Sequence, residues 1–574
     1  MVSTRARSWG LPSRREAPRA YVERPVPFVL RWPLVGLAAA GHLATAALDA
    51  LRRRRWAGPP PVVEPDGPDV VVRGTAFPDD ERRYLLVPFE VRGRPARLEV
   101  DYEWEPLGLL LGDNPLAKTV LDLGVWDEHG YREAAGFRGW SGSRHRRVWI
   151  EAGAAQRGYR PGPLGEGTWH AELGIAAVGP TGAGWTLRVR SRSVGREPAR
   201  VLAPDPVDAA HVARPEPGWY HGDLHMHSWH SHPEAPEPEE FVAFARAAGL
   251  DFLPITEYVV GHHWTTAGAL QRAHPDLLIW PGREIVTYHG HVQCLGETPG
   301  FIEYRHGFED VDIRAIQAGV RAGGALFGVN HPTTFAGPLF RNLCRGCEFE
   351  LGEDVDWDGV DTIEVLTGPM MVDPSHYGLG SLGHDVANPF SASAVELWER
   401  LLDRGHKICA VSGSDDKRGP GLGTSATAVL ARELSRPAIV EGIRAGRAYV
   451  RTLGVHGSPT LELTATNPQG EEGTFGAVLP VEPGAAASLA VTVRGGRGQQ
   501  LRVVRGGERV HAVAIDDDPF TARFAAPRVP AREGPLGTWY RVETADRRCR
   551  TTLSNPVFLV GPAGGSRPGP APPG

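Results

Sequence analysis

The chain has 574 residues, of which 41% are hydrophobic and 23% charged, a balance typical of a globular protein of several domains and not of a disordered chain or a multispan membrane protein. Its 62 lysines and arginines fall short of its 68 acidic residues, so the net charge of −6 offers no basic excess for wrapping nucleic acid. Five cysteines in so long a chain exclude a disulfide scaffold.

The first part of the chain, residues 1–62, is an arginine-rich leader with one apolar segment at residues 32–48. This segment has 17 residues and contains Pro33 and His42, so it is short for a membrane span. It begins too late for a standard signal peptide and lacks a clean small-residue cleavage site. We favour a disordered leader and a cytoplasmic protein. Weak membrane association or a single-pass anchor through this segment is the alternative.

Two regions of short strand-like segments flank the middle of the chain. In residues 66–200, apolar runs or alternating residues lie between turn residues, as at 84–91 and 185–190, and residues 456–561 repeat this style. We expect an N-terminal and a C-terminal β-sandwich-like domain at these places. A disordered tail at residues 562–574 completes the chain.

The middle of the chain, residues 215–453, alternates helix-like and strand-like segments. Residues 238–248 begin with proline and acidic residues, place apolar side chains on one face and end before a glycine, and a strand-like segment follows at 251–256. Such units predict a largely parallel sheet or barrel, with the chemistry at the C-terminal ends of the strands. The same order recurs at 310–322 followed by 325–330 and at 393–404 followed by 407–411.

Histidines gather in this middle part. Thirteen of the 22 lie between His211 and His331, a window that makes up about a fifth of the chain, which suggests metal chemistry. His225 and His227 are two residues apart, so on a strand both side chains would point to the same side and could share one cation. Asp223 could orient one of these imidazoles from behind.

Further phrases rich in metal-ligating residues follow residues 220–232, each at a predicted strand end: 281–284, 288–291, 329–332 and 411–417. This ordered set resembles the PHP superfamily (polymerase and histidinol phosphatase) and, within it, metallohydrolases of the CehA/McbA type. The resemblance covers roughly residues 218–452, and two phrases farther upstream, 137–142 and 167–169, resemble the leading β-domain of that subfamily. Each phrase alone is weak evidence, but their combination is specific.

The resemblance implies an α/β fold: a distorted (β/α)7 barrel flanked by the two β-domains, with metal ions at its C-terminal face. It implies two divalent ions, of Mn, Zn or Fe, that share a hydroxide nucleophile. The first would be held by His225, His227, Glu284 and Asp415, and the second by the bridging Glu284 with His291 and His331.

Some members of the family bind a third metal ion, and at the three positions that would hold it this sequence has other residues: His232, Tyr258 and Lys417. A protonated lysine has no free lone pair, so we expect two ions, with the Lys417 ammonium in the place of a third cation. Lys417 would bind a substrate anion or assist the leaving group, and Tyr258 would donate a proton. A plain salt bridge from Lys417 to a neighbouring carboxylate is an equally good interpretation.

Three classes of function remain, all with a small-molecule ligand: a phosphoesterase, a carbamate or carboxylic-ester hydrolase, and a non-catalytic binding protein with a vestigial metal site. The complete ligand set argues against the third, and we favour the phosphoesterase as the commonest activity of the superfamily. Cys344 and Cys347 form a C-x-x-C that we interpret as a reduced or redox-labile loop pair rather than a zinc site. The candidate substrate contacts are His232, His263, Arg283 and Arg418.

Overall fold

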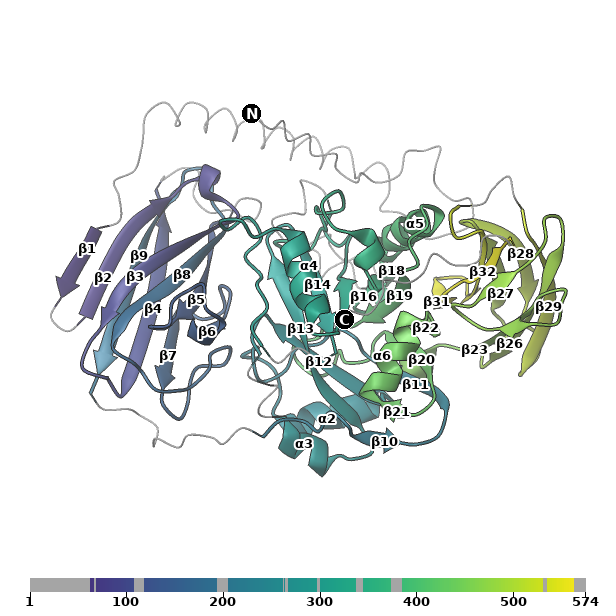
Figure 1. The fold of residues 1–574 in the computed structure, drawn as a ribbon, viewed down its shortest axis with the longest axis horizontal. Helices are drawn as coiled ribbons and strands as arrows, with labels where there is room; N and C mark the ends of the chain where they lie inside the picture. Colours follow the sequence, from purple (N-terminus) through teal and green to yellow (C-terminus); the bar gives the residue numbers. More distant parts are fainter. Residues whose placement is uncertain are drawn as a thin grey trace.

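The computed structural model describes residues 62–66, 69–107, 118–193, 205–261, 263, 267–296, 300–336, 344–372, 385–529 and 534–561. The predicted leader up to residue 61 and the predicted tail at 562–574 lie outside these ranges. Figure 1 shows three parts in chain order: a β-domain, a central part with the helices, and a second β-domain. No helix within the described ranges is both long enough and apolar enough to cross a bilayer.

The N-terminal part is a sandwich of two antiparallel sheets, as the alternating segments predict. Inward-facing side chains of both sheets form one core, with Val100 and Leu187 from the first sheet and Leu123 and Leu173 from the second. The first sheet contains β1 (Val62–Asp66), β2 (Asp69–Ala76), β9 (Ala183–Arg192), β4 (Arg97–Pro106) and β7 (Arg147–Glu151), and the second contains β3 (Arg83–Val91), β8 (Gly167–Ala177), β5 (Val120–Trp126) and β6 (Phe137–Trp140).

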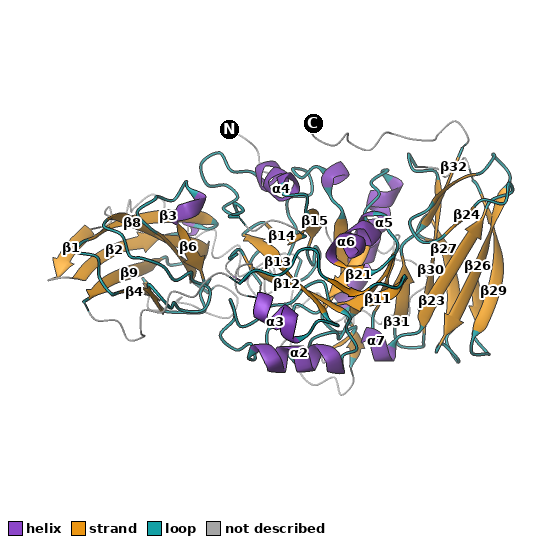
Figure 2. Ribbon diagram, turned by 60° about the horizontal axis from the view of Figure 1, so that its bottom comes forward, coloured by secondary structure: helices purple, strands orange, loops and turns teal. Residues whose placement is uncertain are grey.

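The central part is a twisted sheet with helices packed against it (Figure 2). The predicted helices and strands of this part form close to their expected places. For example, the segment predicted at 238–248 is α2, and α4, α5 and α6 pack on β15, β16 and β20. Its strands are β11 (Gly218–Gly222), β12 (Phe252–Tyr258), β13 (Leu278–Thr287), β14 (Gly290–Leu295), β15 (Leu326–Val329), β16 (Thr362–Thr367), β19 (Cys409–Gly413), β20 (Ala426–Ala431) and β22 (Ala448–Arg451). Its helices are α2 (Pro238–Ala247), α3 (Gly268–Ala273), α4 (Ile313–Ala322), α5 (Pro389–Asp403), α6 (Arg436–Arg444) and α7 (Gly454–Gly457), and the short pairs β10 (Val212–Arg214) with β21 (Leu434–Ser435) and β17 (Met371–Val372) with β18 (Val386–Ala387) lie beside the sheet.

The strand order differs from a uniform parallel barrel. β11, β12 and β13 are parallel, as are β15, β16 and β19, but β14 between them is antiparallel to both neighbours. Among the described residues, β19 and β20 form no backbone-to-backbone strand pairing that would close the sheet into a barrel. They are linked through a side chain, because the Ser412 N–H donates to Thr427 Oγ1 at 2.9 Å. The fold is therefore α/β with many strands, and closure into a (β/α)7 barrel stays a prediction.

The C-terminal part shares the central sheet, because β22 pairs with β31 (Arg550–Ser554). Continuing through β30 (Thr538–Ala545), this sheet faces a second one across a common core that includes Leu463, Val491 and Val542. The remaining strands are β23 (Thr460–Thr466), β24 (Glu472–Gly473), β26 (Ala486–Arg494) and β29 (Phe520–Pro527) in the second sheet, and β25 (Val478–Pro480), β27 (Gln500–Arg505), β28 (Glu508–Ala514) and β32 (Val557–Val560) in the extended one.

The N-terminal and central parts are joined by a shared core with a buried carboxylate. Trp126 packs edge-on against Phe301, with ring centroids 5.3 Å apart. The buried Glu172 carboxylate accepts hydrogen bonds from Trp126 Nε1 (2.8 Å) and the Tyr304 hydroxyl (2.6 Å) and lies 3.7 Å from Arg305 Nη1. Side chains from both parts donate to this one carboxylate, so the two parts are held together as a domain core is.

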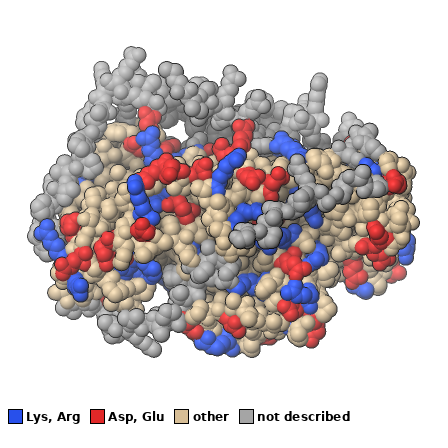
Figure 3. All heavy atoms as spheres, in the orientation of Figure 1, with Lys and Arg blue, Asp and Glu red and all other residues tan. Residues whose placement is uncertain are grey.

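The surface drawn in Figure 3 mixes charges of both signs. Acidic and basic side chains are interspersed on this face, and those of the described residues form no extended basic patch there.

Replacing Glu172 by alanine should lower the free energy of unfolding by about 3–5 kcal/mol, because two buried donors lose their acceptor and Arg305 loses a partner. Urea unfolding followed by tryptophan fluorescence measures this. The matched control is Glu103→Ala, which removes an exposed carboxylate paired with Arg188 and should change stability by less than about 1 kcal/mol. Equal stabilities of the two variants would contradict the structural role of Glu172.

Candidate metal centre

The H-x-H pair lies just beyond β11 rather than on a strand, which corrects the expected location. The two loops that follow β11 and β19 align as a short parallel bridge between Met226 and Asp416. In this bridge the Asp415 N–H donates to the His225 carbonyl at 2.7 Å, and the His227 N–H donates to the Asp416 carbonyl at 2.9 Å. The pairing turns both imidazoles and the Asp415 carboxylate to one side, as the predicted ligand set requires.

Four predicted ligands converge in a first cluster. His225 Nε2 lies 3.4 Å from an oxygen of Glu284 and 3.4 Å from one of Asp415, and His227 Nε2 lies 3.3 and 3.1 Å from oxygens of the same two residues. Atoms that bind one ion at about 2.1 Å lie about 3.0–3.5 Å apart, so this spacing fits a shared cation. His225 Nε2 is buried with no hydrogen-bond partner, as expected of an atom that faces a metal ion.

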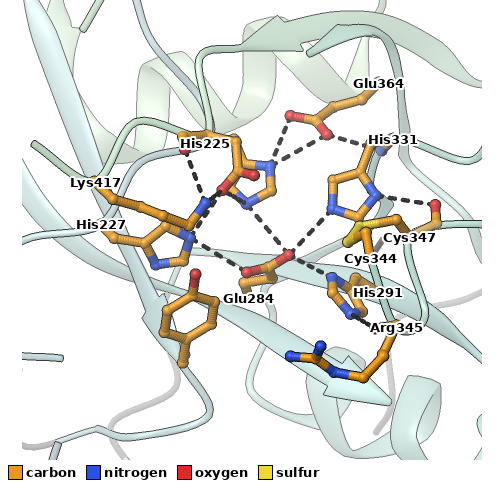
Figure 4. Close-up of a disulfide and its surroundings, with 12 residues drawn as sticks. His225, His227, Glu284, His291, His331, Cys344, Arg345, Cys347, Glu364 and Lys417 are labelled. Carbon is orange, nitrogen blue, oxygen red and sulfur yellow. Dashed lines mark hydrogen bonds and ion pairs between the residues drawn. A yellow bond between two sulfur atoms is a disulfide. The ribbon is translucent and has the colours of Figure 1, made fainter. Parts of the chain in front are cut away.

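The remaining two predicted ligands meet the same Glu284 carboxylate from its other side (Figure 4). Glu284 Oε1 lies 2.8 Å from His291 Nδ1 and 3.2 Å from His331 Nε2. The buried Glu284 thus contacts four imidazoles, and although burial opposes its ionisation, His225 and His291 hold its pKa well below the usual range. One carboxylate between two pairs of imidazoles is the arrangement expected of a bridging ligand.

Glu364 on β16 was not predicted. Its carboxylate accepts from His225 Nδ1 at 3.0 Å and from the His331 backbone N–H at 2.8 Å, and Thr367 Oγ1 donates to it at 3.0 Å. By holding the Nδ1 proton, Glu364 leaves His225 Nε2 free to coordinate an ion. A single acidic residue among the apolar residues at 363–366 was the available indication.

The Cys344–Cys347 loop orients the other two imidazoles. The structure contains a disulfide between these cysteines, which were expected as a reduced or redox-labile pair. His291 Nε2 donates to the Arg345 carbonyl at 3.1 Å, and His331 Nδ1 donates to the Cys347 carbonyl at 3.2 Å. Both histidines therefore present their second nitrogen to Glu284. Cys347 Sγ also lies within 4.8 Å of these ligand atoms.

Asp223 does not orient an imidazole. Its buried carboxylate accepts from backbone N–H groups, those of Ser414 at 2.8 Å, Gly423 at 2.9 Å and His225 at 3.2 Å, and burial raises its pKa to about 6. Asp223 ties the loops after β11 and β19 together, so it supports the centre through the backbone. The role expected of Asp223, orienting an imidazole, is filled by Glu364.

Lys417 lies beside the first cluster. It forms a salt bridge to a neighbouring carboxylate, which was the alternative prediction for this residue. Its ammonium contacts the Asp415 carboxylate and donates to the Asp415 carbonyl at 2.9 Å. Burial acts to lower the pKa of Lys417, but Asp415 outweighs it and the pKa is raised. Tyr258 stacks on His227 with ring centroids 3.9 Å apart, and burial raises its pKa despite Lys417, so the phenol keeps its proton.

Arg144 reaches this place from the loop between β6 and β7. Its Nη2 donates to the Tyr258 hydroxyl at 2.9 Å, and its Nη1 contacts His232 Nε2. Burial and the positive charge of Arg144 lower the pKa of His232 to about 3, so this imidazole is neutral. Sequence reasoning missed Arg144 because it comes from the N-terminal β-domain, far along the chain from every predicted ligand.

The other three candidate substrate contacts have protein partners in the structure, and their contact with a substrate stays a prediction. His263 Nε2 donates to the Gly282 carbonyl at 2.9 Å. Arg283 directly precedes Glu284 on β13, so its side chain points to the opposite face of the strand. There it packs over Gly261, and burial lowers the pKa of Arg283 to about 10. Arg418 is exposed and pairs with Glu234 at 2.5 Å.

Comparisons with known proteins add little. The chain matches no protein-family model and no curated protein. Among solved structures it is similar to a two-domain protein containing a predicted PHP-like metal-dependent phosphoesterase from Bacteroides vulgatus, at 16% identity and a TM-score of 0.31 over 62% of this chain and 98% of that one. It is also similar to PsfC from Pseudomonas syringae, at 16% identity and a TM-score of 0.26 over 39% of this chain and 88% of that one. Likeness at this level assigns no function.

Replacing Glu364 by glutamine should weaken divalent-ion binding about 10- to 100-fold, because the His225 imidazole loses the charged acceptor that fixes its orientation. Competition with a chromophoric chelator measures the affinity. Glu353→Gln, an exposed position in the same part of the chain, is the control and should bind as the unaltered protein does. An unchanged affinity in Glu364→Gln would contradict the assigned role.

Proposed function

We propose that this protein is a hydrolase that uses two divalent metal ions to cleave a phosphoester bond in a small molecule. The observation that carries the proposal is the buried Glu284 carboxylate shared by two pairs of imidazoles. Pairs of divalent ions that share a carboxylate ligand commonly serve displacement reactions at phosphorus and hydrolysis at carbonyl carbon.

The residues fit the two ions. His225, His227, Glu284 and Asp415 would hold one, and Glu284 with His291 and His331 the other, while Glu364 and the loop carbonyls fix the imidazoles. Imidazole and carboxylate ligands suit Mn²⁺, Fe²⁺ and Zn²⁺ alike. When bound, such ions supply charge neutralisation at the substrate oxygens and an activated water as the nucleophile.

Two side chains beside the ligands would act on the substrate. The Lys417 ammonium would stabilise the negative charge that develops on the substrate oxygens. The Tyr258 hydroxyl accepts from Arg144, which leaves its own proton free to pass to the oxygen of the leaving group. No serine or cysteine nucleophile is needed.

The charges at the centre favour a phosphoester over a neutral carbamate or carboxylic ester. Lys417 and Arg144 both lie beside Tyr258, with Nζ 6.0 Å and Cζ 5.2 Å from its ring centroid. Two cations next to a metal centre suit an anionic substrate, whereas a neutral ester would need apolar walls there.

Protein purified without chelators should contain two divalent ions per chain by elemental analysis, and with Mn²⁺ or Zn²⁺ it should hydrolyse p-nitrophenyl phosphate. A Glu284→Ala variant should lose both ions and all turnover, because its carboxylate belongs to both clusters. Three ions per chain would contradict the two-ion centre. Turnover of aryl carbamates or esters alone would favour the alternative hydrolase, and no turnover on either panel would leave a binding protein.

Lys417→Ala should lower kcat/KM for a phosphodiester about 10²- to 10³-fold, because the ammonium stabilises charge on the phosphoryl oxygens. The loss for an aryl carbamate should be much smaller. Lys118→Ala, at an exposed position, is the control, and metal content is measured in each variant, since Lys417 also contacts Asp415. Equal losses on the two substrates would contradict an anion-binding role of Lys417.

A further inference from the structure

The N-terminal β-domain supplies a cation to the metal centre of the central part. Arg144 is exposed, yet the tip of its side chain contacts Tyr258 and His232. Neither partner is a carboxylate, so neither contact is an ion pair. No carboxylate of the described residues forms an ion pair with Arg144.

Arg144 is held in place by neighbours that dock its domain onto the loop after the H-x-H pair. Arg157 Nη1 donates to the carbonyls of His232 at 3.2 Å and Ala235 at 3.1 Å, and its Nη2 pairs with Glu237 at 2.7 Å. The Gly158 N–H donates to the His230 carbonyl at 2.7 Å. These bonds join the segment 144–158 to the segment 230–237, so the position of Arg144 beside the centre is built into the domain contact.

The metal centre is accessible on this same side. The Glu284 side chain is 2% exposed and those of His225 and His227 are fully buried, whereas the side chains of Asp415 and Lys417 are 28% and 25% exposed. Among the described residues, Asp415 and Lys417 therefore mark an exposed side of the first cluster, and Arg144 lies on the same Tyr258 ring as Lys417. Lys417 is paired with Asp415, whereas neither contact of Arg144 is with a carboxylate.

We propose that Arg144, together with Lys417, forms an anion subsite that recognises the dianionic phosphoryl group of a phosphomonoester. This inference rests on the proposed hydrolase and names its substrate class. A monoester carries one more negative charge than a diester, and a guanidinium can pair with phosphate oxygens through two parallel N–H groups. The N-terminal β-domain is then part of the substrate site and not only a flanking domain.

The direct test is the binding of inorganic phosphate to the metal-loaded protein by titration calorimetry. Arg144→Gln should raise the phosphate Kd about 10- to 100-fold, the effect of losing charge-assisted hydrogen bonds, while metal content stays the same. Arg144→Lys should lie between that variant and the unaltered protein. Arg147→Gln, which removes an exposed arginine three residues along, is the matched control and should bind phosphate normally.

A second measurement separates substrate recognition from general damage. Arg144→Gln should lower kcat/KM for p-nitrophenyl phosphate about tenfold more than for bis-p-nitrophenyl phosphate, with the loss mainly in KM. Phosphate affinity that is the same in Arg144→Gln and the unaltered protein would overturn the subsite, and equal losses on both esters would overturn the preference for monoesters. If the protein turns over neither ester, the hydrolase fails, yet phosphate binding still decides whether Arg144 forms an anion subsite.

Discussion

The structure depends on one buried carboxylate. A charge as deeply buried as that of Glu284 is strongly unfavourable unless several partners compensate it, and here four imidazoles from three separate stretches of chain surround it. Each of those imidazoles is in turn held at its other nitrogen or its backbone. The loops after β11 and β15 and the strand β14 must therefore meet at this place, and the loop after β19 joins them there through Asp415. One end of the central sheet is thus the most constrained part of the molecule.

The antiparallel strand β14 serves this constraint. In the β13–β14 hairpin, Val286 pairs with His291, and Glu284 lies two residues from Val286 on the same face. His291 is therefore a diagonal neighbour of Glu284, close enough to contact its carboxylate. A parallel strand reached through a helix would place its ligand only at the strand end, whereas the hairpin sets a ligand directly beside the bridging residue. The departure from uniform βα units thus lies where the centre needs it.

The parts of the centre that could be predicted are those encoded by local spacing and by an ordered set of phrases. The six metal-ligand positions follow from such phrases, and they come together in two clusters. What depends on contacts across the fold could not be predicted. Glu364 reaches His225 from another strand, and the two loop carbonyls that orient His291 and His331 are backbone groups, which leave no mark on the sequence. Closeness along the chain also misleads, because Arg283 directly precedes Glu284 on β13 and its side chain therefore points to the opposite face of the strand.

The position of the N-terminal domain follows from the same reasoning about burial. Glu172 and the aromatic side chains around it make its contact with the central part a continuous core, so Arg144 is presented on a rigid support rather than on a free domain. The C-terminal domain is instead tied to the central sheet by the β22–β31 ladder. Within the described residues, the side chains and carbonyls that hold the six ligands come from the central part and not from this domain. The two β-domains therefore differ in kind: the first lies against the accessible side of the centre, and the second extends the sheet that carries it.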